Sequence, residues 1–438
     1  MVPLACLALL LLLSTYGWSQ AESDGAGIDI AMHTPPPVSI GTYSTDSAME
    51  AESNYWSAGV TVDSGYTNNV VPGNGSPVGS AFVSIWPTFA ISASTSRLNG
   101  LFKYDPGVTF YPSVGSRNQL NQRLALDLEY QLTPHTTASV RDSFRQTSNP
   151  FDQPNPLSNP VSGSTPAPDL ALIVPAADQI YNLGEFQVTY QFGPNSMLGS
   201  GGTFTNLYYP KPEEAPGLYN SNSSAGSAFY SRRIREKHYV GLSYRYMDVS
   251  AYRTGVPGTQ SQVQSVFFFV TLNLKPTLSL SFSGGPQYYK STQAPLPVSA
   301  SWSPLITASF GWQGQRTSLA ASYSRIVTGG GGLAGAYHST LAGVSVKWQF
   351  SRTWNVGIGG NYWLYDTLTP FFFGSSSGGH SVAGTVAFER RLGEYFTMRA
   401  GYTRIQQSYA GIPAISTYPN SNREFLTVSY RVTKSLKR

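Results

Sequence analysis

Apolar and polar residues alternate along most of this chain, in runs of about ten residues. The stretch from Gly343 to Trp363 reads GVSVKWQFSRTWNVGIGGNYW, and every second residue from Val344 to Phe350 is apolar. The alternation resumes after Ser351-Arg352. A period of two gives each strand one apolar and one polar face, and the two-residue gap predicts an antiparallel hairpin. A soluble sheet would need a second layer over the apolar face, whereas a membrane barrel needs lipid outside and water inside.

The same unit repeats from about Tyr55 to Val432, as an alternating run, a very short turn, another run and a longer loop rich in Gly, Ser, Pro and Asn. Eight short turns are expected near residues 95–97, 133–135, 193–195, 235–237, 275–276, 314–315, 351–352 and 393–394. Nine longer loops are expected near residues 68–79, 112–118, 148–180, 210–226, 251–261, 290–300, 329–337, 367–378 and 410–422. Because the two kinds alternate, they predict eighteen antiparallel strands, an even number as in bacterial single-chain barrels. The weakest expected strand is Ala228–Ile234, without which the count falls to sixteen.

The expected strands carry charged residues on the face opposite the apolar stripe. Asp127 and Glu129 lie two residues apart on such a face, which suits a water-filled lumen better than a soluble core. Aromatic residues gather beside the short turns and where strands meet the longer loops, which predicts two interfacial girdles unless strand propensity alone explains them. Two residues depart from the pattern, because Asp142 and Arg390 fall on apolar stripes.

Composition supports an exported β protein. Only 12% of the residues are charged, against about 25% in an average soluble domain, and the mean hydropathy of −0.17 excludes a helical membrane protein. The apolar run Leu4–Leu13 is too short to span a membrane and predicts a signal peptide over residues 1–21. Its Cys6 is the only cysteine, so the mature chain would have no disulfide. The net charge of +5 is spread along the chain, and no dense basic block supports nucleic-acid binding.

These features resemble those of Gram-negative outer-membrane β-barrels, and the chain is similar to uncharacterised putative β-barrel porins. The resemblance covers about Tyr55–Val432 and is carried by the strand pattern, not by a specific motif. Members of this class usually end on an aromatic residue, and the closest match here is FLTVSYRV at Phe425–Val432, which TKSLKR follows. It implies an all-β, transmembrane, antiparallel up-and-down barrel in the outer membrane. The implied partners are outer-membrane lipid, the outer-membrane assembly machinery and small hydrophilic solutes, with a homotrimer as one assembly. The domains are then a signal peptide (1–21), a flexible periplasmic tail or short plug (22–54), the barrel (55–432) and a C-terminal extension (433–438).

The sequence does not predict an enzyme, a metal site or a cofactor. His380-Ser381 resembles the nucleophile pair of outer-membrane phospholipases, but adjacent strand residues point to opposite faces and cannot pair. No HExxH motif or cysteine pair occurs. The run Gly329–Gly332 is read as a loop tip, because no strand, helix and Lys-Ser/Thr surround it as in a phosphate-binding loop.

Candidate functional residues are the charged side chains that the alternation directs into the lumen. The pore-lining candidates are Arg123, Asp127, Glu129, Arg141, Arg145, Glu185, Arg245, Lys347, Glu389, Arg391, Arg399 and Arg431. Eight of these twelve are cationic, which favours a mildly anion-selective interior. The alternative is that they form salt bridges across the wall and stiffen it.

The resulting functional hypothesis is an outer-membrane porin for passive diffusion of small hydrophilic solutes. One alternative is a substrate-specific channel for sugars or exported polysaccharide, which a ladder of lumen aromatic residues would support; Trp363 and Tyr365 are two such residues. Another is a structural or adhesive barrel plugged by residues 22–54. The proline-rich loop 148–180 either folds inward to narrow the channel or stays on the surface. Deleting residues 152–172 and measuring single-channel conductance separates these two positions of the loop.

Overall fold

The computed structural model describes residues 54–70, 77–147, 177–235, 238–275, 277–293, 297–329, 332–333, 336–368, 378–410 and 420–436. The chain divides into two units, Met1–Met32 and His33–Arg438, and all described residues belong to the second. The expected signal peptide and the expected tail, apart from Asn54, therefore lie outside the described residues. Within the described ranges, no helix has the length and apolar character needed to cross a membrane.

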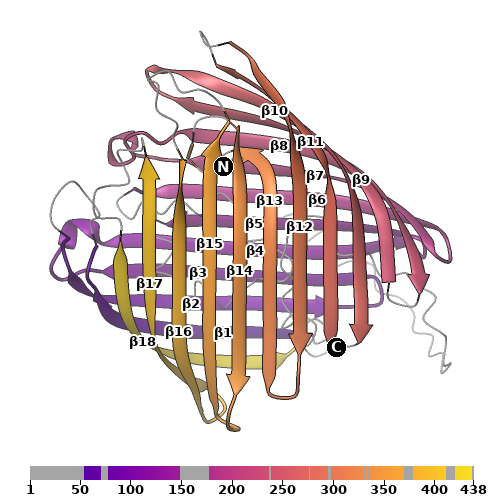
Figure 1. Cartoon of the computed structure of the whole chain (residues 1–438). Helices are drawn as coiled ribbons and strands as arrows, with labels where there is room; N and C mark the ends of the chain where they lie inside the picture. Colours follow the sequence, from indigo (N-terminus) through magenta and orange to yellow (C-terminus); the bar gives the residue numbers. More distant parts are fainter. Residues whose placement is uncertain are drawn as a thin grey trace, which may run out of the picture. The chain divides into compact units, whose positions relative to one another are not determined.

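The second unit is a single antiparallel sheet of eighteen strands that closes on itself, since β1 pairs with both β2 and β18 (Figure 1). The strands are β1 Tyr55–Thr67, β2 Ser80–Ser94, β3 Leu98–Phe110, β4 Gln119–Thr133, β5 Thr136–Thr147, β6 Gln179–Gly193, β7 Ser196–Tyr208, β8 Asn220–Arg235, β9 His238–Arg253, β10 Val256–Lys275, β11 Leu278–Gln293, β12 Ser299–Gln313, β13 Thr317–Gly329, β14 Ala336–Gln349, β15 Trp354–Thr367, β16 Gly378–Leu392, β17 Phe396–Ala410 and β18 Ser421–Ser435. Two short 3-10 helices, η2 Gly115–Arg117 and η5 Pro212–Glu214, lie between strands. The prediction of an all-β, up-and-down barrel with eighteen strands is confirmed, and the alternative of sixteen is excluded.

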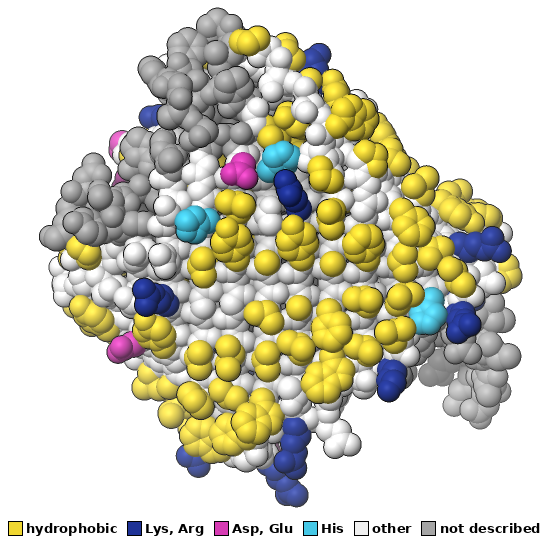
Figure 2. Space-filling view, in the orientation of Figure 1, with side chains coloured by type: hydrophobic (Ala, Val, Ile, Leu, Met, Phe, Trp, Pro, Cys, Tyr) yellow, Lys and Arg dark blue, Asp and Glu magenta, His cyan; other side chains and the backbone are white. Residues whose placement is uncertain are grey.

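The alternating sequence pattern produces two different faces of the sheet. On β6, the exposed side chains are Phe186, Val188, Tyr190 and Phe192, while the residues between them turn toward the interior. Figure 2 shows hydrophobic side chains spread over the outer face, with most Lys and Arg toward its margins. In Figure 1 the strands β12–β17 of the front wall cross the strands β2–β8 behind them at a large angle, as strand tilt in a barrel requires.

Three boundaries differ from the sequence-based expectation. The loop expected at 251–261 is a tight turn at Thr254-Gly255, where Gly255 has φ of 79° and so favours a residue without Cβ. The strand expected at Ala228–Ile234 begins at Asn220 instead. Its first half is polar, but ladders to β7 and β9 hold its backbone whatever its side chains are. The last strand continues past Val432 to Ser435, because Thr433–Ser435 pair with Tyr55–Ser57.

The two charged residues that the sequence analysis found on apolar stripes, Asp142 and Arg390, have local partners. The side-chain amide of Asn182 donates a hydrogen bond of 3.0 Å to Asp142. The guanidinium of Arg390 lies over the Trp354 ring, 5.1 Å from its centroid. Both partners come from a neighbouring strand, so the sequence pattern at a single strand does not reveal them.

The interior is close-packed where a large ring faces a glycine. Trp86 on β2 is buried, and a Cβ placed on Gly107 of β3 would lie 2.3 Å from its Cε3 atom. Only glycine therefore lets the indole lie flat against β3. At Gly115, the first residue of η2, no atom lies within 4 Å of such a Cβ.

We expect Gly107→Ala to destabilise the barrel by about 1–3 kcal/mol, because the added methyl group displaces a buried indole. Gly115→Ala is the matched control and should change stability far less. The measurement is the urea midpoint of the refolded protein in lipid vesicles, followed by tryptophan fluorescence. Equal midpoints for the two variants would show that Trp86 does not need the space at Gly107.

Candidate functional site: the barrel interior

The structure places all twelve predicted pore-lining side chains at inward-facing strand positions. They alternate along their strands with exposed apolar residues such as Tyr130, Val140, Phe186, Val344 and Phe388. The structure does not bring all twelve together, however. Glu129, Lys347, Arg391 and Arg431 are exposed, and the first three lie close to the short turns. Whether the set lines a conducting pore stays a prediction.

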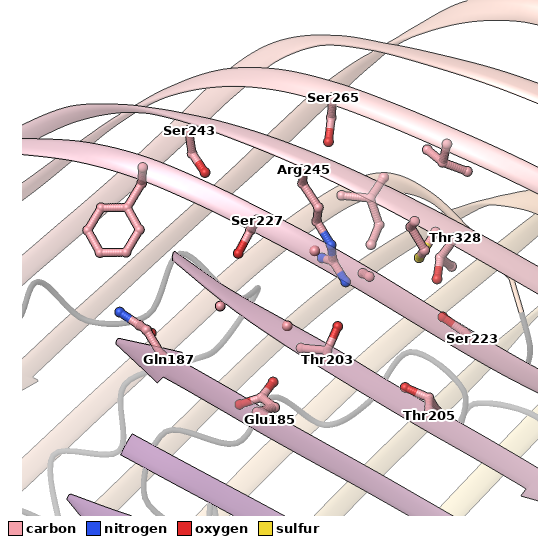
Figure 3. Close-up of a pocket in the computed structure, with 18 of the residues that line it drawn as sticks. Glu185, Gln187, Thr203, Thr205, Ser223, Ser227, Ser243, Arg245, Ser265 and Thr328 are labelled. Carbon is pink, nitrogen blue, oxygen red and sulfur yellow. The ribbon is translucent and has the colours of Figure 1, made fainter. Parts of the chain in front are cut away.

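Three of the twelve, Arg141, Glu185 and Arg245, line an internal cavity of about 160 Å³. Its walls come from β5 to β13, and Figure 3 shows Arg245 and Glu185 reaching into it from different strands. Hydroxyl groups dominate the rest of the polar lining, among them those of Thr203, Thr205, Ser223, Ser227, Ser243, Ser265 and Thr328 (Figure 3). Such a wall offers hydrogen bonds without a strong net field.

The charges around this cavity compensate one another. Arg141 Nε lies 3.2 Å from Asp127 Oδ2, across the pair β4 and β5. The charges of Arg141 and Arg245 both act on Glu185. The lining itself carries two guanidinium groups and one carboxylate, and with the Asp127 carboxylate that pairs with Arg141 the formal charges sum to zero. The sequence left open whether the inward-facing charges form salt bridges across the wall. Arg141 and Asp127 do form one.

A second group of inward charges lies on β3 to β5. Lys103 Nζ is 3.2 Å from Asp105 Oδ2. Arg123 lies opposite Asp105 on one side and Arg145 on the other in the strand register. The guanidinium of Arg145 lies over the Tyr181 ring at 5.4 Å from its centroid. This part of the inner wall carries three cations against one carboxylate, so its charge is positive.

The sequence analysis missed a buried ion pair where the barrel closes. Arg423 Nη2 on β18 lies 2.9 Å from Asp63 Oδ2 on β1, and both side chains are buried. Thr427 donates a hydrogen bond of 2.9 Å to the other oxygen of Asp63. The Arg423 guanidinium also lies over the Phe82 ring, 3.9 Å from its centroid. Parity alone puts Asp63 and Arg423 on the inner face, but their contact depends on the β1–β18 register, which the sequence does not show.

An apolar cluster crosses the lumen near the outer loops. It joins Tyr181 and Leu207 of β6 and β7 to Trp363 and Tyr365 of β15 on another part of the wall. The segment between β7 and β8 supplies Tyr209, Ala215 and Leu218 to it, and Leu333 joins from the segment after β13. We call this set, together with Ala177, Tyr337, Leu341, Ala383 and Ile405, the mouth cluster. It narrows the passage between the cavity and the outer loops.

A backbone hydrogen bond ties the end of the segment between β7 and β8 to the segment after β13. The backbone N–H of Tyr219 donates a bond of 2.9 Å to the carbonyl of Gly332. Burial raises the pKa of the Tyr219 phenol, so this group stays neutral across the physiological range. At the exposed end of the segment, a hydrogen bond to Glu214 and the charge of Asp178 raise the pKa of Lys211. The described narrowing thus involves residues 209–219, whereas residues 148–176 of the loop predicted to narrow the channel lie outside the described residues.

The other sequence candidates do not form a reactive site in the described part of the chain. Ser381 is buried on the inner face, and His380 stacks on the exposed ring of Tyr362 at 6.3 Å between ring centroids. The two residues point to opposite faces, as the strand geometry predicts. No group of three His, Cys, Asp or Glu side chains that could hold a metal ion occurs among the residues described.

Comparison with known proteins gives no sequence relatives. No family model matches the chain, and no curated protein matches it. Solved structures with a similar fold include the FrpB iron transporter (F3-3 variant) of Neisseria meningitidis, which is 10% identical with a TM-score of 0.40 over 84% of this chain and 64% of that one. Acinetobacter baumannii OccAB3 is 12% identical with a TM-score of 0.40 over 86% of this chain and 99% of that one. OccAB4 of the same organism is 8% identical with a TM-score of 0.39 over 88% and 100% of the two chains. The chain spans less than two thirds of the FrpB structure.

We expect Asp63→Asn to lower the free energy of unfolding by about 3 kcal/mol, because it removes the charge that faces a buried guanidinium. Thr427→Val is the matched control on the same carboxylate. It removes one neutral hydrogen bond and should cost about 1 kcal/mol. Urea unfolding of both variants in lipid vesicles gives the two values. A loss in Asp63→Asn no larger than in Thr427→Val would contradict the role given to the ion pair.

Proposed function

We propose that this chain is an outer-membrane channel of a Gram-negative bacterium, through which small hydrophilic solutes diffuse passively. The proposal rests on the distribution of side chains, which is the reverse of that in a soluble protein. Apolar side chains cover the outside of a closed barrel, and charged and hydroxyl side chains line a cavity inside it. A closed antiparallel barrel satisfies its backbone hydrogen bonds without water, which hydrocarbon requires. Barrels of about this strand number leave room for an aqueous channel.

The height of the apolar band supports insertion in a membrane. Trp302 and Trp312 on β12 both face outward, and Trp302 is 68% exposed. The ten-residue spacing corresponds to about 33 Å along a strand at roughly 3.3 Å per residue. A strand tilt of about 40° reduces this to about 25 Å across the membrane, the usual height of the apolar band of such barrels. The two indoles therefore mark the two interfaces.

Selectivity in this proposal comes from two features of the lumen. The mouth cluster limits the size of the solute, because apolar rings from different parts of the wall meet there. Beside it, the positive wall formed by Lys103, Arg123 and Arg145 favours anions mildly, while the neutral cavity does not discriminate by charge. No cofactor takes part.

The alternative of a substrate-specific channel for sugars or exported polysaccharide has one specific observation in its favour. The lumen aromatic residues Trp363 and Tyr365 belong to the mouth cluster, where a solute would have to pass them. The same mouth cluster would support the alternative of a plugged structural barrel if the cluster blocked the lumen permanently. Sugar flux into vesicles separates both from a general porin, because a general porin passes several unrelated sugars and a plugged barrel passes none.

We expect that replacing Lys211–Gly217 by a Ser-Gly linker raises the single-channel conductance at least twofold, since this removes part of the segment that crosses the lumen. Deletion of residues 152–172 provides the comparison between the two loops. Planar-bilayer recordings in potassium chloride measure both variants. Conductance unchanged by the Ser-Gly replacement would rule out the segment between β7 and β8 as the narrowest point.

We expect a reversal potential that indicates mild anion selectivity in a salt gradient, and its loss in the double variant Arg123→Gln, Arg145→Gln. The two arginines supply much of the positive charge of the inner wall. Arg404→Gln is the control, since Arg404 is exposed on the outer face of β17. A cation-selective reversal potential for the unmodified protein would contradict the anion preference.

A further inference from the structure

Two groups of opposite charge enter the internal cavity of about 160 Å³ without meeting each other. Arg245 projects into it from β9 and Glu185 from β6 (Figure 3). Their charges act on each other, but neither side chain forms an ion pair or a hydrogen bond within the described ranges of the chain. Arg141, the third charge of the lining, differs because its Nε lies 3.2 Å from Asp127 Oδ2.

The strand order explains why Arg245 and Glu185 stay apart. Strands β7 and β8 lie between their strands, so their backbones are about 14 Å apart along the sheet at about 4.8 Å per strand. The inward positions between the two residues in the cross-strand register belong to small side chains, namely Gly201, Thr203, Ala225 and Ser227. Small side chains leave space above the sheet, so the cavity opens between the two charges.

Arg245 lies in a row of hydrogen-bond donors. Its cross-strand partners are Ser227 on β8 and Ser265 on β10, and both serines line the cavity. Gln187 lies in the same row beyond Gly201, and its buried Nε2 has no hydrogen-bond partner in the described structure. A guanidinium group binds a carboxylate through two parallel hydrogen bonds, and hydroxyl groups beside it add further donors. This end of the cavity is therefore suited to a carboxylate.

The Glu185 end of the cavity has the opposite need. Its neighbour Arg141 on β5 already binds Asp127, and its neighbour Thr203 on β7 offers one hydroxyl group. An ammonium group carries three donors and no acceptor, so it can donate to the Glu185 carboxylate and to the Thr203 hydroxyl together. This end is therefore suited to an ammonium group.

A ligand with a single charge would satisfy only one of the two groups. A simple anion on Arg245 would be repelled by Glu185, and a simple cation on Glu185 would be repelled by Arg245. A molecule that carries both charges pairs with both groups and leaves the formal charge of the cavity at zero. Because a charge taken out of water needs a partner, the doubly charged ligand has the advantage over both others.

The volume of the cavity limits the size of the ligand. A cavity of about 150 Å³ in another protein holds benzene. Alanine has the same number of non-hydrogen atoms as benzene, whereas leucine has half as many again. A methyl side chain would lie beside Ala225 and Met247, which are apolar parts of the same lining.

We propose that this cavity binds a small α-amino acid in its zwitterionic form, with the carboxylate on Arg245 and its flanking serines and the ammonium group on Glu185 and Thr203. The long side chains of Arg245 and Glu185 reach toward each other, so the two charged ends lie much closer together than the two backbones. The inference rests on the proposed function, because it names the solute class that the channel would favour.

The test is isothermal titration calorimetry with the full chain in lipid nanodiscs, which does not depend on conduction. The probes are alanine, lactate and alaninol, which share a carbon skeleton and carry both charges, only the negative charge and only the positive charge. We expect alanine to bind about tenfold more tightly than either, because each of the others leaves one charge of the cavity unpaired. Equal binding of lactate or of alaninol would overturn the proposal, as would no binding of alanine. Leucine that binds as well as alanine would exclude this cavity as the site.

Two variants test the roles of the two charged residues. Glu185→Gln should weaken alanine binding about tenfold and abolish the preference for alanine over lactate, since the ammonium group loses its partner. Arg245→Gln should abolish the preference for alanine over alaninol. A merely structural role would weaken all three probes alike, and that result would overturn the assignment.

The matched controls are Glu129→Gln and Lys347→Gln, which remove inward charges that are exposed and do not line the cavity. Both should bind alanine like the unmodified protein, and a tenfold loss in either would contradict the location of the site. If a cavity variant does not fold, as judged by loss of heat-modifiable migration on a gel, the three probes on the unmodified protein still decide the proposal.

Single-channel conductance is recorded on the same preparations to separate this proposal from the proposed function. Alanine binding without conductance would contradict the channel but not the binding site. Conductance without alanine binding would contradict the binding site but not the channel.

Discussion

The closure of β1 onto β18 is the interaction on which the rest of the structure depends. Hydrocarbon offers no partner to a free N–H or C=O, so a spanning sheet is stable only when it has no edge. The register of Asp63 with Thr427 completes the ladder, and the ion pair of Asp63 with Arg423 is buried at the same place. A charge in this position requires its partner from the other end of the chain, so the pair can form only when the barrel closes.

Closure also determines what the interior can be. Once the apolar residues are turned outward, the remaining alternate positions face one another across the lumen, and their charges must find partners or water. On β4 and β5 they find partners, as Arg141 does in Asp127. Near the outer loops the lumen is filled differently, because Tyr209, Leu218 and Leu333 bring apolar groups from the connecting segments into contact with the wall. The interior thus combines a neutral polar cavity, a positive wall and an apolar constriction.

The pairing of β12 with β13, which covers only the inner half of β12, is an exception to complete closure, and its position makes it tolerable. Pro304 removes one donor, but Gln287 supplies the bonds that Val327 needs. The unpaired part of β12 extends from Leu305 toward the outer interface at Trp302, where water is close. A similar gap in the middle of the apolar band would leave backbone groups in hydrocarbon, at a cost of several kcal/mol for each group.

The sequence by itself determined the number of strands and the places of most turns. It also determined that the side chain of every predicted pore-lining residue lies on the inner face of the sheet. It could do so because the period of two is a local property that every strand carries separately. It did not predict the turn at Thr254-Gly255 or the polar half of β8, because neighbouring ladders hold these segments more than their own side chains do.

Only the tertiary structure decided which inward residues meet. The pairs Asp63 with Arg423 and Gln287 with Val327, and the mouth cluster, join residues whose contact depends on strand register and on the path of loops. Register and loop path follow from packing across the closed barrel, and a pattern that repeats every two residues carries no record of them.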